Sequence, residues 1–390
     1  MHLTHRTVRL VLAEPLRISR STTAARDAVQ LTLEHGGLRG HGEAVSSIHQ
    51  RLDTGTLLRH FRTAAEGLRR HSGPETALHA LRSGELAADT PPAVTAAVEA
   101  ALLDLVGKRA ATAVHRFLGT RVPPRAPTAR TLSICAPRHA AGQARALAAV
   151  GFSVLKIKAG DRDPEADLDR VRAVRAAAPS ARLLLDANGA WTAARAAALL
   201  PRFAELGVEA VEQPLIPGDI EGLARFAERS PLPVIADEDA VGPEDVRRLA
   251  GRVHGINVKL AKCGGVHAAL RIAALVEGSG TRLMLGCLTA STLGIAPAVH
   301  LADRAHWIDL DGHLLLAHDP WSGIGGEDGT VGASGLPGLG VRPRCAPAES
   351  PGRAPAEGPG GAPIGSPPRA SAGSGSRASS VGNPSRAAVA

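Results

Sequence analysis

Short apolar runs recur through the middle of the chain, and a charged residue closes each of them. Five of these runs are VLKIK, RLLLD, VEAVE, PVIAD and GINVK. Their closing residues, spaced by 22 to 28 positions, are Lys158, Asp186, Glu212, Asp237 and Lys259. Apolar runs of this length are typical of strands buried in a parallel sheet, and the stretches between them are typical of helices. One strand and one helix per repeat predict a β/α barrel.

The same pattern continues on both sides of these runs and predicts eight strands. They span residues 131–135, 153–158, 182–187, 208–212, 233–237, 255–259, 282–287 and 306–311. A helix is expected after every strand but the last, for example at 167–178 and 193–206. The predicted fold class is therefore α/β, a modified TIM barrel of the (β/α)7β type.

The residues before the barrel have a different pattern. Residues 1–50 alternate between apolar and polar positions and predict a hairpin around His35-Gly36-Gly37. Residues 55–83 and 91–109 are helical in pattern. Together these segments predict an α+β domain that precedes the barrel.

The chain also changes character at its end. From residue 342 onward it consists mainly of Pro, Gly, Ser, Ala and Arg, and it cannot bury enough apolar surface to offset the entropy of ordering. We expect an α+β domain, a barrel, a segment that returns to pack on the first domain, and a disordered tail, at 1–125, 126–320, 321–341 and 342–390.

Composition places the chain among globular proteins, with 44% apolar and 21% charged residues. The net charge of +8 is not gathered into basic runs interleaved with aromatic residues, so no nucleic-acid partner is expected. No stretch approaches membrane-spanning length, and the N-terminal run, broken by Glu14 and Pro15, does not resemble a signal peptide. The four cysteines show no paired spacing, which favours a reducing, cytoplasmic location. A homo-oligomer is expected.

The charged strand ends should meet at one mouth of the barrel. Lys158 and Lys259 would lie on opposite strands, the second and the sixth, with Asp186, Glu212 and Asp237 on the wall between them. Three adjacent carboxylates suit a hard dication such as Mg²⁺, and no Cys or His joins them to favour zinc. Any single carboxylate at a strand end is more often a cap for the next helix, but the register of all five residues favours a catalytic site.

This geometry predicts a chemistry. A dication that binds a substrate carboxylate makes the α-proton more acidic, and a neutral lysine can then remove it. The dication and Lys156, on the same strand face as Lys158, both lower lysine pKa values. With one lysine on each face of a planar enediolate, removal and return of the proton would invert the α-carbon.

These residues resemble the enolase superfamily, in its muconate-lactonizing-enzyme-like subgroup. The matching segments are LKIKAG, LLLDANGAW, VEQPL, IADEDA and INVKLAKCGG, together with GLRGHGEAV and AAVEAALLDLVGKRA in the N-terminal part. The resemblance covers residues 5 to 341 and implies an N-terminal capping domain. It implies one Mg²⁺ held by Asp186, Glu212 and Asp237, with Lys158 and Lys259 as the acid/base pair and Lys156 as a supporting cation; Lys262 does not match the base position.

An Asp-x-Asp pair at the last strand, Asp309 and Asp311, resembles dipeptide epimerases, in which such a pair holds the ammonium group of the substrate. The alternative is a pair of acids that caps nearby loops. Arg20 is the candidate for a side-chain carboxylate of the substrate, and Cys287 is a further candidate contact. The resemblance implies epimerisation of an L-Ala-D/L-Glu-like dipeptide at the α-carbon of its C-terminal residue, by a two-lysine 1,1-proton transfer through an enediolate.

Two positions depart from the subgroup pattern. Asp239 replaces a commoner Ser and is expected to add charge near the metal, and Ala290 replaces a usual Glu, which bears on the substrate. Other reactions of the subgroup therefore stay open: N-acylamino acid racemisation, o-succinylbenzoate synthesis or cycloisomerisation. A homologue that binds metal and dipeptide without turnover is a further alternative.

Overall fold

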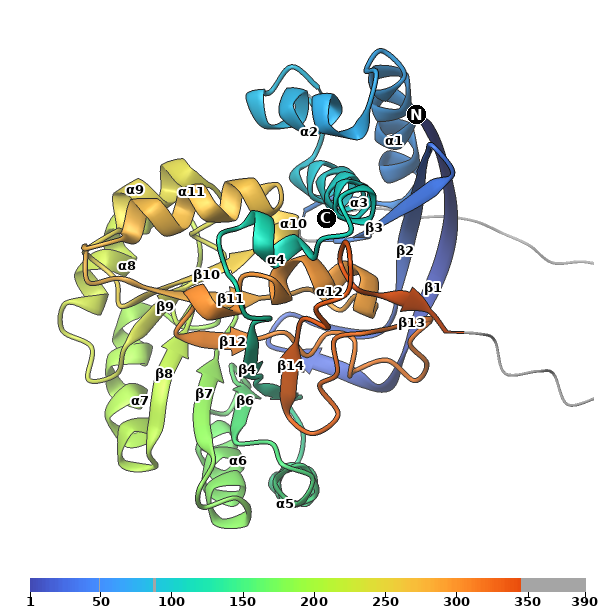
Figure 1. Ribbon diagram of the computed structural model, residues 1–390. Helices are drawn as coiled ribbons and strands as arrows, with labels where there is room; N and C mark the ends of the chain where they lie inside the picture. The colour runs from blue at the N-terminus through green and yellow to red at the C-terminus, as the bar shows by residue number, and fades with distance from the viewer. Residues whose placement is uncertain (49, 87–88, 345–390) are drawn as a thin grey trace, which may run out of the picture. The chain divides into compact units, whose positions relative to one another are not determined.

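The computed structural model describes residues 1–48, 50–86 and 89–344. Its first part is a three-stranded antiparallel sheet followed by three helices (Figure 1). The elements are β1 (His2–Ile18), β2 (Ser21–His35), β3 (Leu38–Val45), α1 (Thr54–Leu68), α2 (Pro74–Ser83) and α3 (Pro92–Arg109). His35 pairs with Leu38 across the turn between β2 and β3, which confirms the predicted hairpin.

Helix α3 packs on β3 at very close range. A Cβ atom at Gly42 would come 2.0 Å from the Ala97 carbonyl oxygen of this helix, so the helix backbone occupies the space of a side chain. Asp104, also on α3, accepts a hydrogen bond of 3.0 Å from His41 N. Helix-to-strand packing therefore explains Gly40 and Gly42 of the GLRGHGEAV segment, whereas Gly37 lies in the turn with a positive φ.

The second part confirms the predicted barrel. Eight parallel strands are hydrogen-bonded in the order β5 to β12, and Ala129 N donates to Ile308 O at 2.8 Å across the remaining seam. The strands are β5 (Arg130–Leu132), β6 (Val154–Lys158), β7 (Arg182–Asp186), β8 (Val208–Glu212), β9 (Val234–Ala236), β10 (Gly255–Lys259), β11 (Arg282–Gly286) and β12 (Trp307–Asp309). The helices between them are α5 (Pro137–Ala149), α6 (Pro164–Ala177), α7 (Ala193–Glu205), α8 (Ile220–Ala227), α9 (Pro243–Leu249), α10 (Leu260–Cys263), α11 (Val266–Val276) and α12 (Thr292–Val299).

Apolar side chains fill the lower part of the barrel interior. They form a buried cluster of Ala129, Val154, Leu184, Ala210, Ile235, Met284 and Trp307. Side chains two positions further along a strand share its face, so the next layer is polar. Its buried members are Lys156, Asp186, Glu212, Asp237, Asn257 and Asp309. A polar, largely charged layer therefore lies next to the apolar one, nearer the C-terminal ends of the strands.

The first barrel strand is shorter than predicted. Ser133 Oγ accepts a hydrogen bond of 2.8 Å from Arg17 N, and Ile134 N donates to Arg17 O at 3.0 Å. Residues 133 and 134 therefore bind the end of the β1–β2 hairpin rather than the barrel. This contact ties the hairpin to the mouth of the barrel.

After β12 the chain returns toward α3. Two short antiparallel pairs form here: β13 (Trp321–Ser322) with β15 (Arg342–Pro343), and β14 (Thr330–Gly332) with β4 (Arg125–Pro127). Leu339 N donates to Asp104 Oδ1 at 2.9 Å. The first residues of the segment predicted to be disordered thus form β15, and the part of that prediction from residue 345 onward lies outside the described residues.

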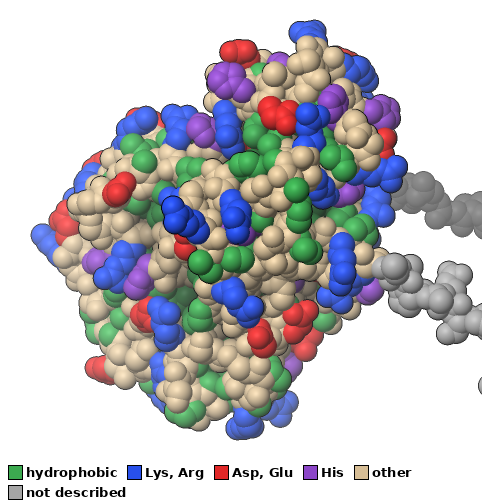
Figure 2. Space-filling model, in the orientation of Figure 1, with side chains coloured by type: hydrophobic (Ala, Val, Ile, Leu, Met, Phe, Trp, Pro, Cys, Tyr) green, Lys and Arg blue, Asp and Glu red, His purple; other side chains and the backbone are tan. Residues whose placement is uncertain are grey.

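The visible surface carries both signs of charge. Figure 2 shows blue and red side chains interspersed over the face that it presents, with hydrophobic side chains between them. None of the helices within residues 1–48, 50–86 and 89–344 has the length and apolar character needed to span a bilayer.

Candidate active site

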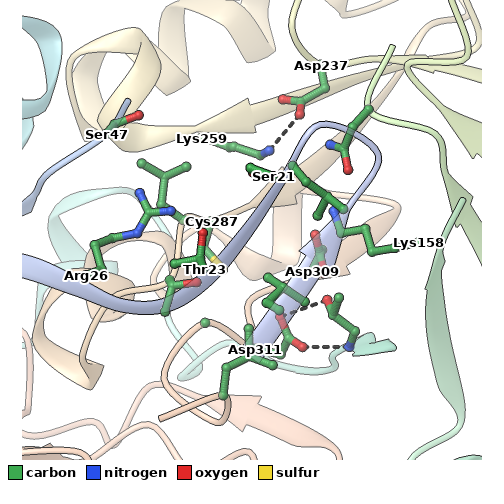
Figure 3. Close-up of a pocket in the computed structure, with 18 of the residues that line it drawn as sticks. Ser21, Thr23, Arg26, Ser47, Lys158, Asp237, Lys259, Cys287, Asp309 and Asp311 are labelled. Atoms are coloured by element: carbon green, nitrogen blue, oxygen red, sulfur yellow. Dashed lines mark hydrogen bonds and ion pairs between the residues drawn. The ribbon is translucent and has the colours of Figure 1, made fainter. Parts of the chain in front are cut away.

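A cavity of about 160 Å³ opens at the C-terminal ends of the barrel strands. Figure 3 shows the end of the β1–β2 hairpin running across it among the labelled side chains. The predicted site residues that line it are Arg20, Lys156, Lys158, Asp237, Lys259, Cys287, Asp309 and Asp311. The two remaining predicted residues, Asp186 and Glu212, lie beneath the cavity and contact Lys156. The structure therefore brings all ten to one place.

Three carboxylates lie at adjacent strand ends. Asp186 ends β7, Glu212 ends β8 and pairs with it in register, and Asp237 directly follows β9. Each of the three residues is at most 2% exposed. Buried charges of one sign are costly unless cations neutralise them.

Lys156 supplies the first neutralising cation. Its Nζ lies 2.6 Å from Glu212 Oε2, 2.7 Å from Asp309 Oδ2 and 3.1 Å from Asp186 Oδ2. The side chain comes from the middle of β6 and is almost completely buried. A supporting electrostatic role fits this position better than direct contact with the α-carbon of a substrate.

Lys158 and Lys259 approach the same cavity from opposite walls. Lys158 ends β6 and its Nζ lies 2.5 Å from Asp186 Oδ2, whereas Lys259 ends β10 and its Nζ lies 2.7 Å from Asp237 Oδ2. These strands are four apart in the sheet order, which places them across the barrel from each other. A flat group between them would have one amine on each side.

The carboxylates and lysines shift each other's pKa. Burial raises the pKa of Glu212 to about 7, and the nearby Asp186 adds to this effect while Lys156 opposes it. Burial would lower the pKa of Lys259, but the carboxylates of Asp237 and Glu212 outweigh it and raise the pKa above its usual value. Lys259 is thus an ammonium group here, and it can act as a base only once another cation neutralises these acids.

The three acids offer the oxygen donors that a hard divalent cation prefers. As placed, no group of three His, Cys, Asp or Glu side chains within the described residues is arranged to hold a metal ion, since lysine ammonium groups contact the acids. The backbone N of Asn188 donates a hydrogen bond of 2.9 Å to Asp186 Oδ1. The side-chain oxygen of Asn188, Oδ1, is buried and has no hydrogen-bond partner within the described residues. This donor set fits a dication that takes over the contacts of the ammonium groups.

Asp309 and Asp311 face the cavity from the end of β12. Lys156 donates a hydrogen bond to Asp309 Oδ2, while the buried Asp309 Oδ1 has no hydrogen-bond partner within the described part of the chain. Asp311 Oδ2 accepts a hydrogen bond of 2.7 Å from Thr131 N and one of 3.4 Å from Arg130 Nη1. Asp311 is thus held by strand β5, and Asp309 keeps an acceptor for a cationic ligand group.

Arg20 lines the cavity with its guanidinium already paired. It forms an ion pair with Glu238, whose Oε1 also accepts a hydrogen bond of 3.4 Å from Asn188 Nδ2. Cys287 follows β11 on the other side of the cavity. Burial raises the pKa of its thiol, and Asp309 and Asp311 raise it further, so the sulfur is neutral at physiological pH.

The sequence excluded Lys262 as the base and gave it no other role, but the structure places it in the lining of the cavity. Its Nζ donates to Asp237 Oδ1 at 2.5 Å and to Asp237 O at 2.6 Å. Helix α10 starts immediately after Lys259, so a side chain three positions on folds back over the strand end. The Lys-x-x-Lys spacing was the available signal. Other residues at the site that were not singled out are Thr131, Asn188, Glu238 and Asn257.

The two departures from the subgroup pattern, Asp239 and Ala290, lie in different surroundings. Asp239 does not face the acids predicted to bind the metal: its carboxylate accepts hydrogen bonds of 2.7 Å from Gln213 Nε2 and from Gly218 N, and so holds the loop after β8. Ala290 lies on the loop after β11. The next residue, Ser291, donates to the buried Glu43 of β3 from both its N and its Oγ, so an acid approaches this loop from the first domain.

Comparison with known proteins adds family matches. The model described as mandelate racemase / muconate lactonizing enzyme, N-terminal domain, matches residues 2–119. The model described as enolase C-terminal domain-like matches residues 139–346. The two matches follow the division between the antiparallel sheet with its helices and the barrel.

Individual relatives match over most of their length. The hydrophobic dipeptide epimerase of Roseobacter litoralis is 33% identical over 348 residues, covering 87% of this chain and 98% of the relative. The L-Ala-D/L-Glu epimerase of Escherichia coli K12 is 31% identical over 308 residues, covering 79% and 92%. The structure of the dipeptide epimerase from Enterococcus faecalis V583 complexed with Mg and L-Leu-L-Tyr is 30% identical with a TM-score of 0.81, covering 87% and 98%.

Proposed function

Because the chain belongs to the mandelate racemase / muconate lactonizing enzyme family of the enolase superfamily, we propose that it is an Mg²⁺-dependent dipeptide epimerase. The observation that carries this proposal is the placement of Lys158 and Lys259 on opposite walls of one cavity. Buried carboxylates lie between them. Relatives named as dipeptide epimerases match the chain over most of their length.

In this proposal Asp186, Glu212 and Asp237 hold one Mg²⁺. The bound cation would make the α-proton of the substrate more acidic and lower the pKa of the neighbouring lysines. Lys156, whose Nζ lies within 3.1 Å of Asp186 and Glu212, would help to balance the charge of these acids. Burial of the whole layer excludes water that would compete for the lysines.

The two lysines then exchange roles during turnover. One, as a neutral amine, removes the proton from the α-carbon of the C-terminal residue and becomes an ammonium group. The other, as an ammonium group, donates a proton to the opposite face and becomes neutral. The α-carbon inverts, and the reverse reaction uses the same two groups in exchanged roles.

The other end of the cavity would hold the N-terminal residue of the dipeptide. Asp309 and Asp311 supply negative charge there for a free ammonium group, and Asp309 Oδ1 has no other partner in the described residues. We propose an L-Ala-D/L-Glu-like dipeptide as the substrate, with Arg20 contacting the side-chain carboxylate. Arg20 must exchange its pairing with Glu238 for the substrate to bind in this way.

The proposal is tested by solvent exchange. Dipeptides incubated with enzyme and Mg²⁺ in D₂O should gain one deuterium at the C-terminal α-carbon, by mass spectrometry, and should epimerise by chiral chromatography. Lys158→Ala and Lys259→Ala should each reduce epimerisation by about 10²- to 10⁴-fold. An enzyme that exchanges no α-proton in any dipeptide tried, or epimerises normally without one of these lysines, would contradict the proposal.

A further inference from the structure

The charges that line the cavity are balanced with one exception. Of its six cationic lining residues, five form ion pairs with acidic residues of the site: Arg20, Lys156, Lys158, Lys259 and Lys262. The sixth is Arg26, on β2. No described Asp or Glu lies within ion-pair distance of its guanidinium. The adjacent Asp27 pairs with Arg9 instead.

Arg26 is also poorly satisfied as a hydrogen-bond donor. Its Nη1 donates to Ser46 O at 2.8 Å, and this is the one hydrogen bond that the guanidinium makes to described residues. Its Nε is buried and has no partner among them. Burial lowers the pKa of Arg26 from its usual value, because a desolvated cation without a counterion is disfavoured. An unpaired, partly buried cation of this kind is a natural partner for an anionic group of a ligand.

The position of Arg26 indicates which part of a ligand it meets. Figure 3 shows Arg26 and Cys287 on one side of the pocket and Lys158 on the other. Arg26, Cys287, Asp309 and Asp311 all line this cavity, and in the view of Figure 3 Cys287 lies between Arg26 and Asp309. The loop after β11, Cys287-Leu288-Thr289-Ala290-Ser291, contains no acid that could neutralise Arg26.

Arg20 lies in a different part of the same cavity. It pairs with Glu238, which follows the metal-binding Asp237 and contacts Asn188. The two arginines therefore flank different ends of the dipeptide in the proposed orientation. Arg20 is near the C-terminal residue, and Arg26 is near the N-terminal residue, beside the acids that would hold the ammonium group.

We infer that Arg26 binds a side-chain carboxylate of the N-terminal residue, so that at this position the enzyme prefers Asp or Glu to the Ala of the L-Ala-D/L-Glu-like dipeptide proposed above. The inference rests on the proposed function for the orientation of the dipeptide. The planar guanidinium fork can receive a carboxylate in two parallel hydrogen bonds. A neutral amide of the same shape offers a donor to the guanidinium and would be rejected.

The test compares isosteric dipeptides. L-Asp-L-Leu is measured against L-Asn-L-Leu, and L-Glu-L-Leu against freshly prepared L-Gln-L-Leu, by calorimetric binding in Mg²⁺ and by α-proton exchange. The wild-type enzyme should prefer the acidic member of at least one pair by about 10- to 100-fold. In Arg26→Gln the ratio of acidic to neutral dipeptide affinity should fall toward one. Arg26→Lys keeps the positive charge but loses the planar guanidinium, so it should retain part of the preference.

Two controls separate the inference from its alternatives. Arg9→Gln, a nearby exposed arginine on β1, should leave the preference unchanged. Arg20→Gln should change selectivity between L-Ala-L-Glu and L-Ala-L-Gln but not between L-Asp-L-Leu and L-Asn-L-Leu. Equal binding of both members of each pair by the wild type, or an undiminished preference in Arg26→Gln, would overturn the inference. If the enzyme exchanges the α-proton of neutral dipeptides and shows no preference for acidic ones, the inference about Arg26 is overturned and the proposed epimerase activity stands. If the enzyme binds acidic dipeptides preferentially but exchanges no α-proton, only the proposed epimerase activity is contradicted.

Discussion

Asn257 Nδ2 donates a hydrogen bond of 2.8 Å to Glu212 Oε1, within the buried layer below the cavity. Asn257 lies two residues before Lys259 and shares its strand face. On the neighbouring strand, a Cβ atom at Gly286 would come 2.3 Å from Asn257 Oδ1. The amide is therefore confined by the packing of β11 and fixes the orientation of Glu212.

This relationship predicts a specific effect of Asn257→Leu. Glu212 would lose its amide donor, and its already raised pKa would rise further, so its carboxylate would bind a dication less well. We expect Mg²⁺ affinity to fall by about 10- to 100-fold, measured by calorimetry. Gln30→Leu is a matched control, because Gln30 Nε2 donates to the buried Glu43 Oε2 at 2.7 Å away from the cavity. Equal Mg²⁺ affinity in wild type and Asn257→Leu would show that the amide does not support the metal.

The pairing of Arg20 with Glu238 predicts a competition with acidic substrates. Glu238→Gln removes the competing carboxylate, so the ratio of kcat/KM for L-Ala-L-Glu over L-Ala-L-Gln should rise several-fold. Arg20→Gln should lower the same ratio by about 10- to 100-fold, since a charged hydrogen bond is lost. The ratio is the readout because Glu238 adjoins Asp237 and its replacement also affects turnover. A ratio that Arg20→Gln leaves unchanged would assign the recognition of this carboxylate to another residue.

The carboxylates of β12 predict discrimination between free and acylated amino groups. Asp309→Asn removes a charge that would face the ammonium group of the substrate in the proposed orientation, so kcat/KM for L-Ala-L-Glu should fall by about 10²-fold or more. N-acetyl-L-Ala-L-Glu has no ammonium group, and its slow exchange should change much less. If N-acylated compounds are instead the better substrates of the wild type, the N-acylamino acid racemase alternative is favoured.

Strand positions were largely predictable because each buried apolar run is closed by a charged residue. β8 and β10 have the predicted bounds, 208–212 and 255–259. Their apolar residues fill the barrel, and their closing residues mark the mouth. The first strand was overpredicted, since its last residues bind Arg17, more than a hundred positions earlier. Local sequence pattern carries no information on such a contact.

The charged centre could likewise be predicted from strand ends, whereas its pairings could not. Neighbouring strand ends place side chains near one another by topology alone. The pairing of Arg20 with Glu238 joins residues 218 positions apart, and Asp239, although adjacent in sequence to the acids, turns away to Gln213. Side-chain direction at loops depends on backbone turns that residue type does not determine.

A final prediction concerns a buried histidine far from the cavity. His300 Nδ1 accepts a hydrogen bond of 3.1 Å from His115 N, and its Nε2 lies 3.2 Å from Leu339 O. This environment suits a neutral ring with the proton on Nε2. Burial lowers the pKa of His300 from 6.5 to about 4, and His115 adds to this effect while the Leu339 carbonyl opposes it.

The lowered pKa makes stability depend on pH. Below pH 6.5 the unfolded chain binds a proton at this residue that the folded chain does not bind until about pH 4. The contribution of His300 is therefore complete above pH 6.5 and decreases as the pH falls toward 4, by about 2 kcal/mol at pH 5. His300→Gln, which does not titrate, should reduce the loss of unfolding free energy between pH 7.5 and 5 by that amount, measured by urea denaturation. The exposed His2→Gln should leave the loss unchanged, and an identical loss in wild type and His300→Gln would assign the acid sensitivity to other groups.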